Sequence, residues 1–272
     1  MIPKIIHQTY HNSNLPTELS EVVNQLKANN PDWEYRFYTD IDIDYYILKN
    51  FTPEIYNTYQ SINPVYGAAK ADLFRYLVLY QEGGVYLDIK STCLYPLSQV
   101  LKDNDKFLIT QWQNNLEQDY AGAGIYKTIS KLGEVNGEYQ QWVLAVEKHS
   151  PIMKAVIDEV INNINTYRPW KYKLNSYGKN GVLIITGPIA YTKAVYPFKN
   201  TEGVHYERYD KNLGFIYNAL PENHVKVFKK HYSRYKQPIV QHNFVIDMIY
   251  KLYILGIRSA KNILRIIKKE DL

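Results

Sequence analysis

Hydrophobic and polar positions change their period several times along the chain, and each change predicts a new element. Residues 17–29 place apolar side chains every third or fourth position, which puts them on one face of a helix. Residues 66–82 repeat this pattern and stop at Gly83-Gly84, because glycine tolerates the left-handed backbone that closes a helix. Short apolar runs lie between these segments and are typical of buried strands.

Together these patterns predict strands that alternate with helices. The predicted strands are residues 2–9, 34–38, 85–87, 107–110, 182–185, 203–209 and 239–242. The predicted helices are residues 17–29, 40–50, 66–82, 138–148 and 151–166, with another opening at Gly187-Pro188. The polar residues 168–181 are predicted to form a long loop. Such alternation predicts an α/β fold around a mostly parallel sheet.

The length and composition predict one main domain with a helical addition. A chain of 272 residues that is 46% hydrophobic can bury a sizeable core. We assign residues 1–243 to the main domain and residues 244–272 to a C-terminal helix that mixes apolar and basic residues. A basic amphipathic helix of this kind packs either on the domain or on an anionic membrane surface.

Charge, cysteine content and apolar runs exclude several classes of protein. The first residues lack the pattern of a signal peptide, and no run reaches the roughly 18 apolar residues of a membrane span. The single cysteine, Cys93, cannot form an internal disulfide and favours a reducing compartment. We therefore expect a cytoplasmic protein, peripheral at a membrane if its last helix binds lipid. A net charge of +5 without a basic-aromatic motif predicts no nucleic-acid partner.

The candidate chemistry lies between residues 68 and 90. Asp72 and Arg75 share one face of an otherwise apolar helix, and Asp88 follows a short buried strand. The charged pair forms either a buried salt bridge or a ligand clamp. Ligands of open α/β sheets bind beyond the carboxyl ends of the strands, where Asp88 is predicted to lie. Trp112 also follows a strand and either contacts a substrate or lies in a solvated loop.

These residues belong to a set of short blocks that resembles glycosyltransferase family 32, the sugar transferases with a DXD motif. The blocks follow the order that the family has. They are Ile2–Gln8, Asn30–Trp33, Tyr38–Asp40, Ala71–Tyr76, Gly83–Asp88, Tyr95–Leu97, Thr186–Pro188 and a late histidine, His242. The resemblance covers roughly the first 100 residues and two later anchors.

The resemblance implies a GT-A fold and a retaining transfer of a sugar from a nucleotide-diphosphate donor, a UDP- or GDP-sugar. The acceptor would be a saccharide, lipid-linked or free, in glycan or surface-polysaccharide synthesis. The alternative is a protein that binds the nucleotide sugar without transferring it. The implied catalytic residues are Asp72, Arg75, Asp88 and Lys90, and the implied donor-binding residues are Gln8, Thr9, Tyr86, Gly187 and Pro188.

The chain departs from the family at the DXD motif, which reads Asp88-Ile89-Lys90. In the family the second acid of this motif binds Mn²⁺ or Mg²⁺, whereas a protonated lysine cannot bind a metal ion. Two alternatives follow. Either the Lys90 ammonium takes the place of the metal and neutralises the diphosphate, or Asp88 and His242 still hold an ion together with the substrate phosphates.

Overall fold

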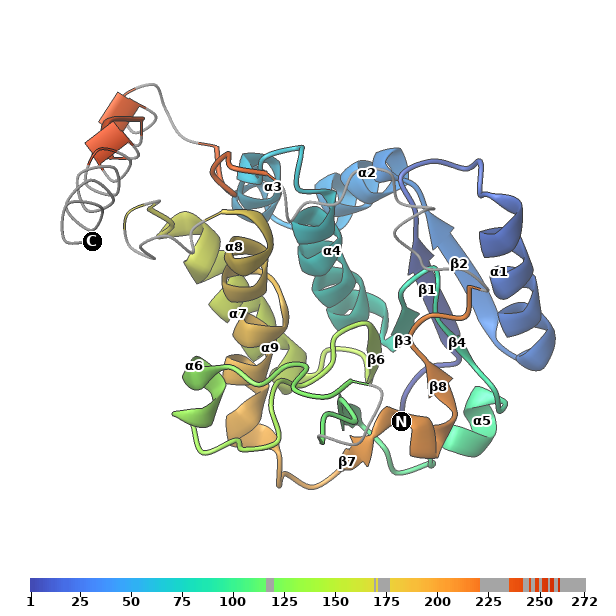
Figure 1. Cartoon of the computed structure of the whole chain (residues 1–272). Coiled ribbons are helices and arrows are strands. Elements are labelled where there is room, and N and C mark those ends of the chain that lie inside the picture. The colour runs from blue at the N-terminus through green and yellow to red at the C-terminus, as the bar shows by residue number, and fades with distance from the viewer. Residues whose placement is uncertain are drawn as a thin grey trace, which may run out of the picture.

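A computed structural model gives the structure of the chain (Figure 1). It describes residues 1–115, 120–168, 170, 177–220, 235–241, 245, 248, 249, 251–253, 255, 256 and 259. The strands are β1 (Ile5–Thr9), β2 (Glu34–Tyr38), β3 (Gly84–Leu87), β4 (Thr92–Cys93), β5 (Phe107–Gln111), β6 (Val143–Val146), β7 (Val204–Tyr209) and β8 (Phe215–Ile216). The helices are α1 (Thr17–Asn29), α2 (Asp40–Asn50), α3 (Pro53–Ser61), α4 (Gly67–Glu82), α5 (Leu97–Val100), α6 (Lys127–Ser130), α7 (Pro151–Asn165), α8 (Gly178–Ile185) and α9 (Pro188–Val195), with 3₁₀ turns η2 (Tyr196–Phe198) and η3 (Asp210–Leu213).

The main sheet has six strands in the order β2-β1-β3-β6-β5-β7. Strands β1, β2 and β3 pair in parallel, and so do β5 and β7. Strand β6 lies between these two groups and is antiparallel to β3 and to β5. The other strands therefore share one direction and end at one edge of the sheet. This confirms the predicted α/β fold with a mostly parallel sheet.

Helices cover both faces of the sheet and bury two apolar cores. Figure 1 shows α1 on one side and α4, α7 and α9 on the other. The larger core joins Leu73 and Leu77 of α4 to side chains of α7 and α9 and to alternate residues of the sheet. The smaller core joins Leu26 of α1 to the opposite residues of β3 and β5. This alternation follows from the two-residue period of a strand.

A tight turn between α4 and β3 fixes the helix that carries the candidate residues. Gly83 and Gly84 have φ of 69° and 101°, which favour glycine. A Cβ on Gly84 would lie 2.5 Å from the carbonyl oxygen of Ile5 in β1, so only glycine allows this close approach. The buried His7 ring bonds the carbonyl of Gly83 at 2.9 Å through Nε2. Burial lowers the pKa of His7 to about 4, which keeps the ring neutral.

Two predicted elements adopt the other kind of regular secondary structure. Residues 138–148, predicted as a helix, contain the strand β6, and residues 182–185, predicted as a strand, form the last turns of α8. Both are short apolar runs, which periodicity alone does not assign to a helix or to a strand. Part of the predicted loop 168–181 likewise belongs to α8, which begins at Gly178.

The division of the chain at residue 243 stays a prediction, because most of the segment after it lies outside the described residues. Its described positions include five apolar side chains that are 42–61% exposed, namely Val245, Met248, Ile249, Leu252 and Leu255. No helix in the described ranges is long and apolar enough to cross a membrane. The predicted strand 239–242 is wrong over its described residues 239–241, where Val240 makes an isolated bridge to Ile62 and no strand forms.

Candidate active site

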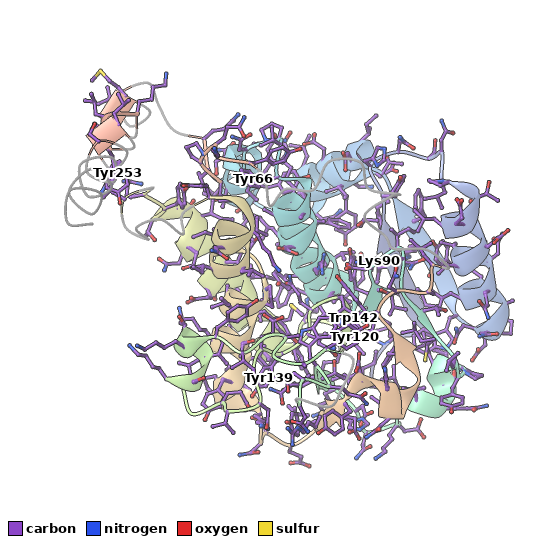
Figure 2. The ribbon with its side chains drawn as sticks, in the orientation of Figure 1. Tyr66, Lys90, Tyr120, Tyr139, Trp142 and Tyr253 are labelled. Carbon is purple, nitrogen blue, oxygen red and sulfur yellow. The ribbon has the colours of Figure 1, made fainter. Side chains whose placement is uncertain are left out.

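A cavity of about 790 Å³ opens at the edge where the parallel strands end. Thr9 ends β1, Asp88 follows β3 and Trp112 follows β5, and all three line the cavity. Strand β6 runs the other way, so the residues that lead into it, such as Gln141, reach the same cavity. Lys90 and Trp142, both labelled in Figure 2, also line it.

Asp72, Arg75 and Asp88 meet in the wall of this cavity. The Nη2 atom of Arg75 lies 3.3 Å from Oδ1 of Asp72 and 3.3 Å from Oδ1 of Asp88. Asp72 and Arg75 are buried, whereas the Asp88 side chain is 25% exposed. The pair therefore satisfies both sequence-based alternatives, because it is a buried ion pair and it also lines the cavity. Asp88 is the most exposed side chain of the three.

Two residues outside the predicted site hold the Asp72 carboxylate. Thr186 donates a hydrogen bond from Oγ1 to Oδ2 at 2.9 Å, and Gln141 donates from Nε2 to Oδ1 at 3.1 Å. The carbonyl of Gln141 also accepts a 2.7 Å hydrogen bond from Nη1 of Arg75. Burial raises the pKa of Asp72 to about 6, although Arg75 and the Thr186 hydroxyl lower it. Thr186 is the first residue of the block Thr186–Pro188, which resembles the family, whereas no sequence pattern pointed to Gln141.

Lys90 extends into the same cavity and sits above an aromatic ring. Its Nζ lies 3.9 Å from the centre of the Tyr217 ring, a cation–π contact. The side chain is only 8% exposed, and burial lowers the pKa of its amine while Asp88 raises it. A cation therefore stands in the cavity at the position of the second acid of the DXD motif.

The predicted nucleotide-side residues divide into two groups. Tyr86 and Thr9 line the cavity and bond each other through their hydroxyls at 3.1 Å. The Tyr86 ring also packs against the Arg75 guanidinium, 4.6 Å from the ring centre. Gln8 is not among the lining residues. It accepts from the Tyr35 hydroxyl and donates to the Asp88 carbonyl at 3.2 Å, so it supports the loop that carries Asp88.

Of the remaining predicted residues, Pro188 lines the cavity as the first residue of α9. Gly187 caps that helix, and a Cβ there would lie 2.8 Å from the Cα atom of Leu183, so glycine permits the close packing of α8 and α9. His242 lies outside the described residues, so its proposed metal-binding role stays a prediction.

The far side of the cavity carries polar residues that the sequence did not point to. Glu138, Gln140 and Trp142 are all buried and all line the cavity. They belong to the chain segment that enters β6, together with Gln141. Trp112 lies beside them, partly exposed, and donates from Nε1 to Oε1 of Glu138 at 2.9 Å.

The described residues do not match the two-carboxylate metal site of the DXD motif. Lys90 replaces the second acid, and Asp88 is engaged by Arg75. Within the described ranges, no group of three or more histidine, cysteine, aspartate or glutamate side chains is placed to hold a metal ion.

Comparison with solved structures identifies the fold as GT-A. The solved structure of the PaToxG glycosyltransferase matches with a TM-score of 0.51 and 20% sequence identity, over 74% of this chain and 72% of that chain. The chain therefore has the GT-A fold of that glycosyltransferase, with a cavity at the ends of the parallel strands.

Sequence comparison then matches part of the chain to a family. Residues 16–108 match the family described as "Glycosyltransferase sugar-binding region containing DXD motif". Inositol phosphoceramide mannosyltransferase 1 of Schizosaccharomyces pombe is 28% identical over 51% of this chain and 45% of its own length. The initiation-specific alpha-1,6-mannosyltransferase of Candida albicans is 26% identical over 73% of this chain and 53% of its own. The chain spans about half the length of these relatives.

Proposed function

We propose that the protein transfers a hexose from a nucleotide-diphosphate sugar to a hydroxyl of a saccharide or lipid-linked acceptor, with retention of configuration. The observation that carries the proposal is the contact of Asp72, Arg75 and Asp88 in a cavity at the carboxyl ends of parallel strands. Two relatives are named as mannosyltransferases, so GDP-mannose is the first donor to test.

In this proposal Arg75 keeps two carboxylates in fixed positions for the donor. Its guanidinium holds Asp72 and Asp88 at equal distances and packs against the Tyr86 ring. Carboxylate oxygen atoms accept hydrogen bonds from sugar and ribose hydroxyls. Asp88 is the more exposed of the two acids and accepts such bonds directly, whereas Asp72 contributes from the buried end of the cluster.

Lys90 stabilises the leaving group in the same scheme. As the glycosidic bond breaks, negative charge develops on the nucleoside diphosphate, and a cation held in a site with little water stabilises that charge strongly. The Tyr217 ring stabilises the ammonium through the cation–π contact and leaves its charge in place. In this scheme Lys90 takes the place of the metal ion that the DXD motif implies.

The transfer itself balances without a covalent intermediate. The acceptor oxygen forms a bond to the anomeric carbon on the face from which the diphosphate leaves. The bond from that carbon to the phosphate oxygen breaks, and the departing phosphate oxygen takes the hydroxyl proton. Retention follows because attack and departure occur on one face.

The first experiment measures thermal stabilisation by GDP-mannose, UDP-glucose, UDP-galactose and UDP-N-acetylglucosamine, each with Mn²⁺, Mg²⁺ or EDTA. A ligand that binds only the folded chain raises the melting temperature, by an amount set by its concentration relative to Kd. We expect one donor to stabilise the wild type in EDTA and to be consumed when a saccharide acceptor is added.

Substitutions at Lys90 make the test specific. Lys90→Ala is expected to lower the transfer rate by roughly a hundredfold, which is the size of the effect when one charge-stabilising group is lost. Lys90→Asp rebuilds the DXD motif and is expected to recover activity only with Mn²⁺. Lys154→Ala removes an exposed lysine of α7 that does not line the cavity and serves as the control.

Three results would contradict this scheme in whole or in part. A wild type that requires Mn²⁺ for transfer contradicts the role of Lys90 and redirects attention to Asp88 and His242. Donor binding without transfer to any acceptor of a broad panel supports the alternative of a nucleotide-sugar-binding protein. Stabilisation by none of the donors, checked by isothermal titration calorimetry, refutes the proposed function.

A further inference from the structure

The side of the cavity that leads into β6 carries hydrogen-bonding groups that the protein does not use. Glu138, Gln140 and Trp142 are 6%, 2% and 3% exposed. Oε2 of Glu138, Oε1 of Gln140 and Nε1 of Trp142 have no hydrogen-bond partner among the described residues. Buried polar groups are normally satisfied, so three such atoms in one short segment that lines the cavity call for an explanation.

Gln141 and the Trp142 carbonyl bond residues proposed to bind the donor, whereas Glu138 and Gln140 lie earlier in the segment, beside the end of β5. The segment follows the family match, which ends at residue 108, and it enters the cavity only because β6 is antiparallel. The backbone N–H of Gln140 donates a 2.8 Å hydrogen bond to the Thr110 carbonyl, which holds this residue at the end of β5. Glu138 is thus placed beside the residues that follow β5, away from the end of β1 that carries Thr9.

Glu138 and Trp112 together have the composition of a saccharide subsite. Trp112 is partly exposed to the cavity and donates from Nε1 to one oxygen of the Glu138 carboxylate. Among the described residues the second oxygen has no hydrogen-bond partner, and the charge of Lys179 lowers the pKa of this carboxyl. A flat aromatic ring packs against the apolar face of a sugar, and a carboxylate accepts bonds from its hydroxyls.

The loop around this pair is built to hold it in place. Gly124 has φ of 72°, and a Cβ there would lie 2.7 Å from Cγ of Glu138 and 3.0 Å from Cδ1 of Trp112. Asn114 donates to the carbonyls of Ala123 and Asn136 at 2.9 and 2.8 Å, which ties the two sides of the loop together. The backbone therefore packs against both side chains and fixes their positions, as a preformed site requires.

We propose that Trp112, Glu138 and Gln140 form the subsite for the acceptor saccharide, with Glu138 accepting a hydrogen bond from a sugar hydroxyl and Trp112 packing against the ring. This assignment rests on the proposed function, because it names the second substrate of the same cavity. Burial raises the pKa of the Glu138 carboxyl to about 7, the behaviour of a group whose charge the protein leaves without a close partner.

The test separates acceptor binding from donor binding. Saturation-transfer difference NMR measures binding of a panel of methyl glycosides (α-mannoside, α-glucoside, β-galactoside) to wild type, Glu138→Gln and Trp112→Ala in the absence of donor. Isothermal titration calorimetry measures the donor affinity of the same proteins. Glu147→Gln replaces a carboxylate just beyond the opposite end of β6, outside the cavity, and is the matched control.

We expect both cavity variants to bind the preferred glycoside about tenfold or more weakly, which is the effect of one hydrogen bond to a charged group. Donor affinity should change less than twofold, which also shows that the variants are folded. Trp112→Phe keeps an aromatic ring and should lose less than Trp112→Ala. Equal glycoside binding by wild type and Glu138→Gln, or no binding of any glycoside by a wild type that binds donor, overturns the subsite. A wild type that binds glycoside but no donor refutes the proposed function and leaves the subsite standing.

Discussion

Replacing Glu138 with glutamine is expected to stabilise the protein at alkaline pH and not at acid pH. Burial raises the pKa of this carboxyl from 4.5 to about 7. The folded chain therefore holds the proton more tightly than the unfolded chain. The free energy of unfolding is then greatest below pH 4.5 and falls as the pH rises through about 7. An amide at this position does not ionise, so the variant escapes this loss.

The size of the effect follows from the two pKa values. With about 1.4 kcal/mol for each pKa unit, the ionised carboxylate costs about 3 kcal/mol at pH 8 and about 1 kcal/mol at pH 5. The difference in unfolding free energy between Glu138→Gln and wild type should thus increase by about 2 kcal/mol from pH 5 to pH 8. The hydrogen bond from Trp112 is kept, because the amide oxygen accepts it in place of the carboxylate. Any cost of the unpaired amide group is common to both pH values and cancels.

Urea denaturation followed by far-ultraviolet circular dichroism at the two pH values measures this difference. Glu147→Gln, a carboxylate that is 26% exposed, gives the baseline for replacing an acid with its amide. If the stability of Glu138→Gln relative to wild type is the same at pH 5 and pH 8, the carboxyl is not held out of solvent as described. That result would also contradict the burial of Oε2 of Glu138 without a hydrogen-bond partner among the described residues.

Two further predictions concern the support of the donor residues. Thr186→Val removes the hydroxyl that donates to Asp72 and should cost about 1–3 kcal/mol of unfolding free energy and weaken donor binding. Thr186→Ser should restore both, and a Thr186→Val variant with unchanged donor affinity would show that this bond does not orient the acid. Gly84→Ala places a Cβ against the Ile5 carbonyl at φ of 101° and should cost at least about 2 kcal/mol in the same denaturation assay. Gly67→Ala, with open space around its Cβ, is the control, and equal stability of the two variants would contradict the close approach.

Elements were predicted well where their apolar repeat continues over many residues or where a clear boundary ends them. Helix α4 has such a repeat and ends at the Gly83-Gly84 turn, and its observed bounds differ from the prediction by one residue. The segment 138–148 has neither, because its apolar run is short and continuous. Its strand conformation depends on pairing with β3 and β5, which lie more than thirty residues away along the chain. That information is tertiary, and no local pattern carries it.

The same contrast holds for the site. Asp72, Arg75 and Asp88 could be named because their spacing around one helix and one strand brings them together. Glu138 and Gln141 could not, because the segment that carries them was assigned to the wrong element. The polar side of the cavity could not be predicted either, because it depends on the same tertiary pairing of β6 with β3 and β5. The role of each named residue in donor binding remains a prediction for the experiments above.

The antiparallel course of β6 has a consequence for how such an enzyme can diversify. The chain leaves the sheet after β5 and returns through β6 at the same edge, so the intervening loop begins and ends beside the cavity. Insertions, deletions or exchanges within that loop need not disturb helix α4, which carries Asp72 and Arg75. Under the proposed function, exchanging this loop between related transferases would alter which molecule receives the sugar while the sugar that is delivered stays the same.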